Sequence, residues 1–273
     1  MSGEPSFAGQ VVVVTGAGAG IGLATARHLT ARGARTVFAS LEAPETVQEK
    51  LDDQSGDFLY VQTDVGDEAS VQALIDRTVA HYGRLDGLVN NAGVTVQHDF
   101  LEASPDDFDR LVRTNLRSVF LCSQRAARVM RRQGGGVIVN VASNHAGRSL
   151  AGFDLYAATK GGVVSLTRAM AWSLGGYGVR ALSVSPGLTL VETLQRWLAT
   201  DPQGSRYLEH YRSAHATARA NAPEDVAAVI AFLLSDAARG ITGEDVVVDN
   251  GMSARLFQDL TPAPAAAPDR SPP

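Results

Sequence analysis

Residues 11–22 read VVVVTGAGAGIG, an apolar run that ends in a glycine-rich segment. The dinucleotide-binding fingerprint G-x-G-x-x-G does not fit here, because neither Gly16 nor Gly18 is followed by a glycine five residues later. What fits is a G-x-x-x-G-x-G spacing at Gly16, Gly20 and Gly22. A strand that turns through glycines into a helix can present backbone N–H groups to a pyrophosphate. The stretch therefore indicates a nucleotide-binding turn, although a tight strand–helix turn without a ligand would look the same.

Apolar runs rich in β-branched residues alternate with helical patterns along the chain. Most of the runs are apolar throughout, which is typical of parallel strands buried on both faces, and between them apolar residues recur at three- and four-residue spacing. We expect strands over 11–15, 36–40, 58–62, 87–91, 137–143, 179–185 and 245–249, and helices over 23–31, 68–81, 106–130 and 156–174. The pairs Ser104-Pro105 and Ala222-Pro223 are typical helix starts. The sequence predicts an α/β fold, a single Rossmann-type doubly wound parallel β-sheet flanked by helices on both faces.

Composition and charge exclude several classes of function. The 273 residues carry a formal net charge of −5, which offers no basic surface for nucleic acid or an anionic membrane. The one cysteine, Cys122, rules out an internal disulfide and is expected to be an ordinary buried thiol, and no C-x-x-C or H-E-x-x-H spacing indicates a metal. The polar start MSGEPSFAGQ has no basic leader, and the longest apolar runs are about half the length of a membrane span. We therefore expect a cytoplasmic protein with no nucleic-acid, membrane or metal partner.

Three polar residues point to redox chemistry. Ser143 ends the expected strand 137–143, and open α/β sheets bind ligands beyond the carboxyl ends of their strands. Tyr156 and Lys160 are four residues apart, so their side chains emerge on one face of a helix. A nearby ammonium lowers the pKa of a tyrosine, and a serine hydroxyl can hydrogen-bond a carbonyl oxygen that is being reduced. The three residues suit proton transfer beside a nicotinamide, although a tyrosine and a lysine at this spacing are more often a surface pair.

Seven motifs in order make the chain similar to the short-chain dehydrogenase/reductase family over about residues 8–253. They are TGAGAGIG (15–22), Asp64-Val65, NNAG (90–93), Asn115 in RTNL, Ser143, YAATK (156–160) and SPG (185–187). The resemblance identifies T-G-x-x-x-G-x-G as the phosphate loop of this family. It implies an N-terminal extension over 1–7, a Rossmann-fold catalytic domain over 8–253 and a substrate lid over about 188–220. The Pro/Ala-rich tail over 254–273 ends in TPAPAAAPDRSPP, whose five prolines in thirteen residues leave it no core to join, and we expect the tail to be disordered.

The resemblance also implies the roles of individual residues. Asn115, Ser143, Tyr156 and Lys160 form a catalytic tetrad, in which Asn115 kinks its helix and holds a water in a proton relay to Lys160. The alternative is an asparagine that only satisfies backbone groups within a long helix. The cofactor-binding residues implied are Gly16, Gly18, Gly20, Ile21, Gly22, Ser40, Leu41, Asp64, Val65, Asn91, Ala92, Gly93, Tyr156, Lys160, Pro186, Gly187 and Thr189.

The end of the second strand favours NAD over NADP. Family members that use NAD commonly have an aspartate at the place of Ser40, and here Leu41 and Glu42 follow it. The loop 17–19 holds no cation, Arg35 lies at the far end of the strand, and Glu42 would repel a 2′-phosphate. NAD is the expected cofactor and NADP remains possible. A second departure from the family, VDNG at 248–251 in place of VDGG, carries no consequence at this level.

The substrate is the least determined part of the site. Substrate contacts are expected from Ser143, His145 and Tyr156, with Asn144, Val94 and Gln97 as further pocket residues, although a loop histidine without a ligand is an equal alternative for His145. A secondary alcohol, cyclic or polyol-like, oxidised to a ketone is favoured. The alternatives are reduction of a 3-oxoacyl thioester on an acyl carrier protein, and a non-catalytic nucleotide-sensing protein on the same fold. The resemblance further implies a homotetramer or homodimer packed through the helices of Asn115 and Tyr156.

Overall fold

Seven parallel strands form one sheet in the order β3-β2-β1-β4-β5-β6-β7. The computed structural model describes residues 6–52 and 54–255, so most of the expected tail and extension lie outside the described residues. The strands are β1 (Val11–Thr15), β2 (Arg35–Ser40), β3 (Phe58–Gln62), β4 (Gly87–Asn90), β5 (Gly136–Val141), β6 (Val179–Pro186) and β7 (Asp245–Val248). Every expected strand is confirmed, with ends that differ by at most two residues.

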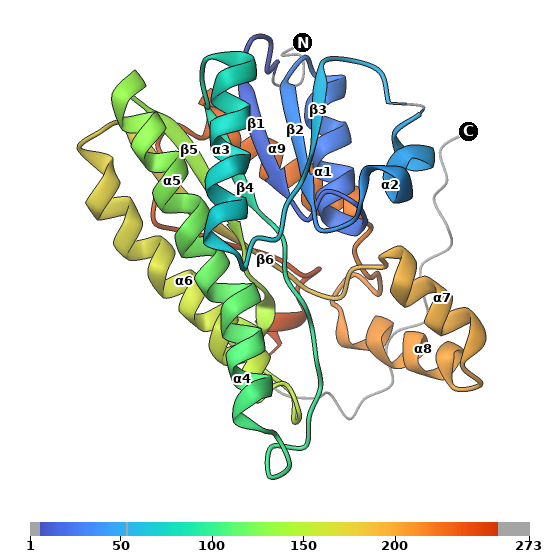
Figure 1. Ribbon diagram of the computed structural model, residues 1–273. Coiled ribbons are helices and arrows are strands. Elements are labelled where there is room, and N and C mark those ends of the chain that lie inside the picture. The colour runs from blue at the N-terminus through green and yellow to red at the C-terminus, as the bar shows by residue number, and fades with distance from the viewer. Residues whose placement is uncertain (1–5, 53, 256–273) are drawn as a thin grey trace.

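Helices cover both faces of this sheet (Figure 1). One layer contains α1 (Gly20–Ala31) and α9 (Pro223–Leu234), and the other contains α3 (Glu68–Tyr82), α5 (Ser118–Gln133) and α6 (Asp154–Gly175). The remaining helices are α2 (Pro44–Leu51), α4 (Pro105–Leu111), α7 (Glu192–Thr200) and α8 (Gly204–Ala214). Successive residues of β1 join opposite layers: Val12 and Val14 pack with α1 and α9, whereas Val13 packs with α3 and α5. Strands between two helical layers are therefore apolar at every position.

Ser104 and Pro105 start α4 as expected. The Ser104 hydroxyl accepts a hydrogen bond from the backbone N–H of Asp107 at 3.2 Å, and the Asp107 carboxylate accepts one from the backbone N–H of Ser104 at 3.2 Å. This reciprocal capping box satisfies two N–H groups that a helix start leaves unpaired. The same hydroxyl donates to the Asp107 carboxylate, and these hydrogen bonds lower the pKa of Asp107.

The helix expected over 106–130 is interrupted around Asn115, where the family resemblance implies a kink. Between α4 and α5 the chain forms a π-helix, η1 (Val112–Arg117), so the helix is widened for six residues and carries Asn115 within that widening. A π-turn shifts the backbone hydrogen bonds by one residue and frees a carbonyl from the regular ladder. The sequence VRTNLR contains neither glycine nor proline, so no local signal marked this interruption.

The order of the strands fixes where a ligand can bind. Strand β1 has β2 on one side and β4 on the other. The chain therefore adds β2 and β3 on one side of β1 and the later strands on the other side, so the strand order reverses between β1 and β4. In open α/β sheets this switch point opens a crevice at the carboxyl ends of the strands. Five of the predicted site residues lie at such ends: Gly16 follows β1, Ser40 ends β2, Asn91 follows β4, Ser143 follows β5 and Gly187 follows β6.

Three further observations concern residues outside this crevice. Cys122 is buried in α5, and burial raises the pKa of its thiol to about 12. Among residues 6–52 and 54–255, no helix is long and apolar enough to span a membrane. Within the same ranges no cluster of three or more His, Cys, Asp or Glu side chains could hold a metal ion.

Candidate active site

The glycine loop after β1 is packed so closely that side chains would not fit. Gly16 has φ +65°, and a Cβ there would lie 2.9 Å from the Cα of Ala92. A Cβ on Gly22 would lie 2.2 Å from the carbonyl oxygen of Gly16. Helix α1 then begins at Gly20 with no side-chain cap on its N-terminal N–H groups. A short loop of glycines and alanines beside uncapped N–H groups fits a dinucleotide pyrophosphate.

Thr15 and Asn91 join this loop to the end of β4. The backbone N–H groups of Asn91 and Ala92 both donate to Thr15 Oγ1, at 3.0 and 3.1 Å. In return the Asn91 amide donates to the carbonyl oxygens of Thr15 and Gly16, at 3.0 and 3.3 Å. The motif at residues 90–93 therefore holds the glycine loop in place. Its last residue, Gly93, lies next to Asn115 and Lys160 of the predicted tetrad.

Ser143, Tyr156 and Lys160 meet at the carboxyl end of β5. Lys160 is 5% exposed. Its ammonium donates to the carbonyl oxygen of Val141 at 2.8 Å and lies 5.7 Å from the centroid of the Tyr156 ring. Burial lowers the pKa of Lys160, and the charge of an ionised Tyr156 acts in the opposite direction. The Ser143 hydroxyl accepts the backbone N–H of His145 at 3.2 Å. A buried ammonium beside a phenol can stabilise the phenolate, as acid–base chemistry by tyrosine requires.

Asn115 is fully buried and its side chain holds the segment after β4. Its Oδ1 accepts the backbone N–H of Val94 at 2.8 Å, and its Nδ2 donates to the carbonyl oxygen of Val94 at 2.9 Å. The same Nδ2 lies 3.3 Å from Thr159 Oγ1, on the helix that carries Tyr156 and Lys160. A Cβ on Gly93 would lie 3.2 Å from Asn115 Oδ1 and 3.5 Å from Lys160 Nζ. The side chain of Asn115 therefore fixes the position of Gly93 and Val94, which form one wall of the site. Because both ends of its amide are engaged in this way, a water relay would use the main chain of Asn115.

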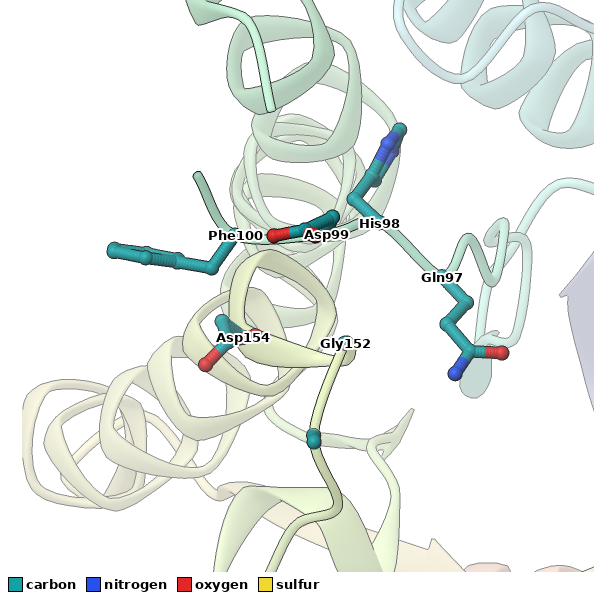
Figure 2. Close-up of a pocket in the computed structure, with 7 residues that line it drawn as sticks. Gln97, His98, Asp99, Phe100, Gly152 and Asp154 are labelled. Atoms are coloured by element: carbon teal, nitrogen blue, oxygen red, sulfur yellow. The ribbon is translucent and has the colours of Figure 1, made fainter. Parts of the chain in front are cut away.

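His145 packs beside the tetrad, whereas Gln97 lies further out. The His145 ring is 4.7 Å from the Phe153 ring and 5.7 Å from the Tyr156 ring, its Nδ1 is 2.9 Å from Ser149 Oγ, and burial lowers its pKa. Gln97 instead lines an open cavity of about 610 Å³ at the rim. Figure 2 shows Gln97 pointing away from Phe100, with Asp154 of α6 on the opposite side. The other residues that line this cavity are His98, Asp99, Ala151 and Gly152.

At the other end of the crevice, Ser40 and Glu42 lie against Gly18. A Cβ on Gly18 would lie 2.7 Å from Ser40 Oγ and 2.8 Å from Glu42 Oε2, and the Ser40 hydroxyl donates to that carboxylate oxygen. Leu41 between them is 68% exposed. The loop itself holds no cation, but a more distant residue brings one to it, because Lys50 of α2 donates to the carbonyl oxygen of Gly18 at 3.1 Å. Lys50 lies 32 residues beyond Gly18, and no local pattern links the two.

Asp64 has a partner that the sequence did not suggest. Its Oδ1 accepts the backbone N–H of Gly66 at 2.8 Å, and its Oδ2 forms a salt bridge of 2.7 Å with Arg113. Arg113 belongs to η1, the π-helix that also carries Asn115. The loop after β3 is thereby tied to the helix of the tetrad. Val65, the other predicted residue of this loop, is buried.

The segment 188–220 contains two helices, α7 and α8, which lie below α1 and α2 in Figure 1. Its two ends meet in a parallel bridge between Thr189 and Asn221, and Asn221 donates to the carbonyl oxygen of Val248 at 2.6 Å. Asn250 has φ +52° and donates to Asn221 Oδ1 at 2.6 Å. This backbone conformation suits glycine or asparagine, which explains why VDNG can replace VDGG. Pro186 ends β6, and Gly187 follows it just before this bridge.

Comparison with known proteins agrees with this geometry. Residues 16–253 match the sequence profile of a family described as enoyl-(acyl carrier protein) reductase. The levodione reductase of Leifsonia aquatica is 38% identical over 257 residues, which cover 91% of this chain and 96% of that protein. The meso-2,3-butanediol dehydrogenase of Serratia marcescens is 40% identical over 250 residues, with coverage of 91% and 96%. A Burkholderia xenovorans structure assigned to the short-chain dehydrogenases/reductases superposes with a TM-score of 0.87 at 32% identity, covering 93% of this chain and 100% of that one.

Proposed function

Because the chain belongs to the short-chain dehydrogenase/reductase family of NAD(P)-dependent oxidoreductases that act on CH–OH groups, we propose that it interconverts a secondary alcohol and a ketone. The observation that carries the proposal is the buried ammonium of Lys160, 5.7 Å from the ring centroid of Tyr156 and anchored on Val141. The favoured substrate is cyclic or polyol-like, which agrees with the levodione and butanediol in the names of two relatives.

Each residue of the tetrad has a distinct task in this reaction. The Tyr156 hydroxyl exchanges a proton with the substrate oxygen, and Lys160 stabilises the phenolate that remains after proton loss. The Ser143 hydroxyl donates a hydrogen bond to the same substrate oxygen, where negative charge develops during reduction. Asn115 fixes the position of Val94, and with it the wall of the site that Gly93 and Val94 form. When bound, the nicotinamide supplies or accepts the hydride.

Reduction of a 3-oxoacyl thioester is the second candidate, because the matched family carries an acyl-carrier-protein reductase in its description. A carrier protein would require a basic docking patch, whereas the cavity beside α6 is lined by Asp99 and Asp154. A nucleotide-sensing protein without catalysis would not require a buried lysine beside a tyrosine. Both features favour a small uncharged alcohol or ketone.

A substrate screen tests the proposal directly. Purified protein with NAD or NADP is offered a panel of cyclic, vicinal-diol and acyclic secondary alcohols, and the reduced cofactors are offered the matching ketones and a 3-oxoacyl thioester. Absorbance of the reduced nicotinamide reports turnover. We expect turnover of cyclic or polyol-like alcohols. Turnover of the thioester alone would establish the second candidate, and nucleotide binding without any turnover would favour a sensing protein.

We predict a higher kcat/KM with NAD than with NADP. Glu42 lies against Gly18, so its carboxylate would repel a 2′-phosphate by about 1 kcal/mol, a factor of about fivefold to tenfold. Glu42→Ala should narrow the preference, and Leu41→Arg should shift it toward NADP because that position is exposed and adjacent. Steady-state kinetics with both cofactors provide the measurement. A wild-type preference for NADP would contradict the role assigned to Glu42.

We also propose a homotetramer or a homodimer packed through α5 and α6. Phe120 on α5 is 46% exposed and Trp172 on α6 is 91% exposed, although both helices bury an opposite face against the sheet. Large exposed apolar side chains on adjacent helices favour a closed symmetric interface. Light scattering at micromolar concentration should give a mass of two or four chains, and Trp172→Glu should lower it. A monomeric wild-type mass would refute the assembly.

A further inference from the structure

The chain contains only two lysines, and both contact backbone carbonyl groups in the cofactor crevice. Lys160 belongs to the tetrad, whereas Lys50 comes from α2, a helix with no proposed part in the reaction. Its Nζ donates to the carbonyl oxygen of Gly18 at 3.1 Å. An ammonium is thus placed at the loop that the adenosine end of the cofactor is expected to contact.

Lys50 also faces the lid. Its Nζ lies 3.5 Å from Oε2 of Glu192, the first residue of α7. Glu42 lies near the same glycine, since a Cβ on Gly18 would be 2.8 Å from Glu42 Oε2. Gly18 therefore has both a carboxylate and an ammonium close to it, and the carboxylate of Glu192 offsets the charge of the ammonium.

We propose that Lys50 is a second determinant of cofactor specificity, opposed by Glu42 and attenuated by Glu192. The proposal rests on the dehydrogenase function proposed above. An ammonium at Gly18 attracts a ribose 2′-phosphate, whereas Glu42 repels it and is suited to accept hydrogen bonds from a ribose diol. Glu192 weakens the attraction because its own carboxylate engages the ammonium. The balance keeps the wild-type site selective for NAD and leaves a measurable affinity for NADP.

Binding of two pairs of ligands isolates the effect of the 2′-phosphate. NADH is compared with NADPH by nicotinamide fluorescence, and adenosine 5′-monophosphate is compared with adenosine 2′,5′-bisphosphate by calorimetry. Lys50→Met should raise the Kd of both 2′-phosphorylated ligands relative to their partners by about fivefold to tenfold, as expected for loss of one nearby charge. Lys50→Arg should keep the wild-type ratio of the two Kd values, that of the 2′-phosphorylated ligand divided by that of its partner. Glu192→Gln should lower this ratio of Kd values, because Lys50 is then free of the carboxylate that weakens its attraction for the 2′-phosphate. The effect of Glu192→Gln should largely vanish in the Lys50→Met background.

Arg35→Gln is the matched control, because it removes one positive charge at the opposite end of β2, where Arg35 pairs with Asp57 at 3.4 Å. It should leave the ratio unchanged. A Lys50 that only supports the loop would weaken all four ligands equally in Lys50→Met, and such an unchanged ratio would overturn the proposal while leaving the dehydrogenase function intact. A wild-type protein that binds neither NADH nor NADPH would instead overturn the proposed function, and the role of Lys50 with it.

Discussion

Tyr156→Phe is expected to lower kcat by about 10²- to 10⁴-fold, the range typical of a lost general acid–base group. The substitution removes only the hydroxyl, so the ring that lies 5.7 Å from the Lys160 ammonium and 5.7 Å from His145 stays in place. The Kd for NADH should therefore remain within about twofold of the wild-type value. The measurement is a single-turnover rate with reduced cofactor, together with a fluorescence titration of NADH.

Tyr177→Phe is the matched control for this experiment. Tyr177 is 46% exposed, and the aromatic ring that the Arg131 guanidinium overlies at 5.1 Å is retained in phenylalanine. The control should keep wild-type turnover. Near-normal turnover in Tyr156→Phe would remove Tyr156 from the proton-transfer step, and a large loss of NADH affinity would show that the hydroxyl serves cofactor binding instead.

Much of the fold was predictable because its determinants are local. Strand β1 has valines on both of its faces, and α4 is preceded directly by its capping residue Ser104 and begins at Pro105. Placement of the site also follows from local patterns, since Ser143 follows β5 and Tyr156 and Lys160 share one turn of α6. The individual roles came from the family resemblance, because spacing alone leaves a surface pair as an alternative.

The interactions that were missed are long-range in sequence. Lys50 reaches Gly18 across 32 residues, and Arg113 reaches Asp64 across 49. Neither pair has a periodicity or turn signal, because the contacts depend on how α2 and η1 pack against loops of other elements. The π-helix around Asn115 was predicted only as the kink that the family resemblance implies, since nothing in its six residues disfavours a regular helix. Such features arise from tertiary packing and require coordinates.

Asn115→Ala is expected to lower the free energy of unfolding by about 2–5 kcal/mol. The variant removes the two hydrogen bonds, of 2.8 and 2.9 Å, between the Asn115 amide and the backbone of Val94, and each lost hydrogen bond costs about 0.5–1.5 kcal/mol. A small cavity adds to this cost because Asn115 is fully buried. Urea denaturation monitored by circular dichroism provides the measurement.

Asn140→Ala separates stability from catalysis. Asn140 is also fully buried and also uses both ends of its amide, since it donates to Thr167 Oγ1 at 2.8 Å and accepts from Asn90 Nδ2 at 2.8 Å. The two variants should lose similar stability for the same reason. Asn115→Ala alone should also lower kcat per folded molecule by about tenfold or more, because Gly93 and Val94 line the site beside Lys160 and a displaced wall misplaces the reacting groups. Equal kcat values in the two variants would limit Asn115 to a structural role, and the proposed tetrad would reduce to Ser143, Tyr156 and Lys160.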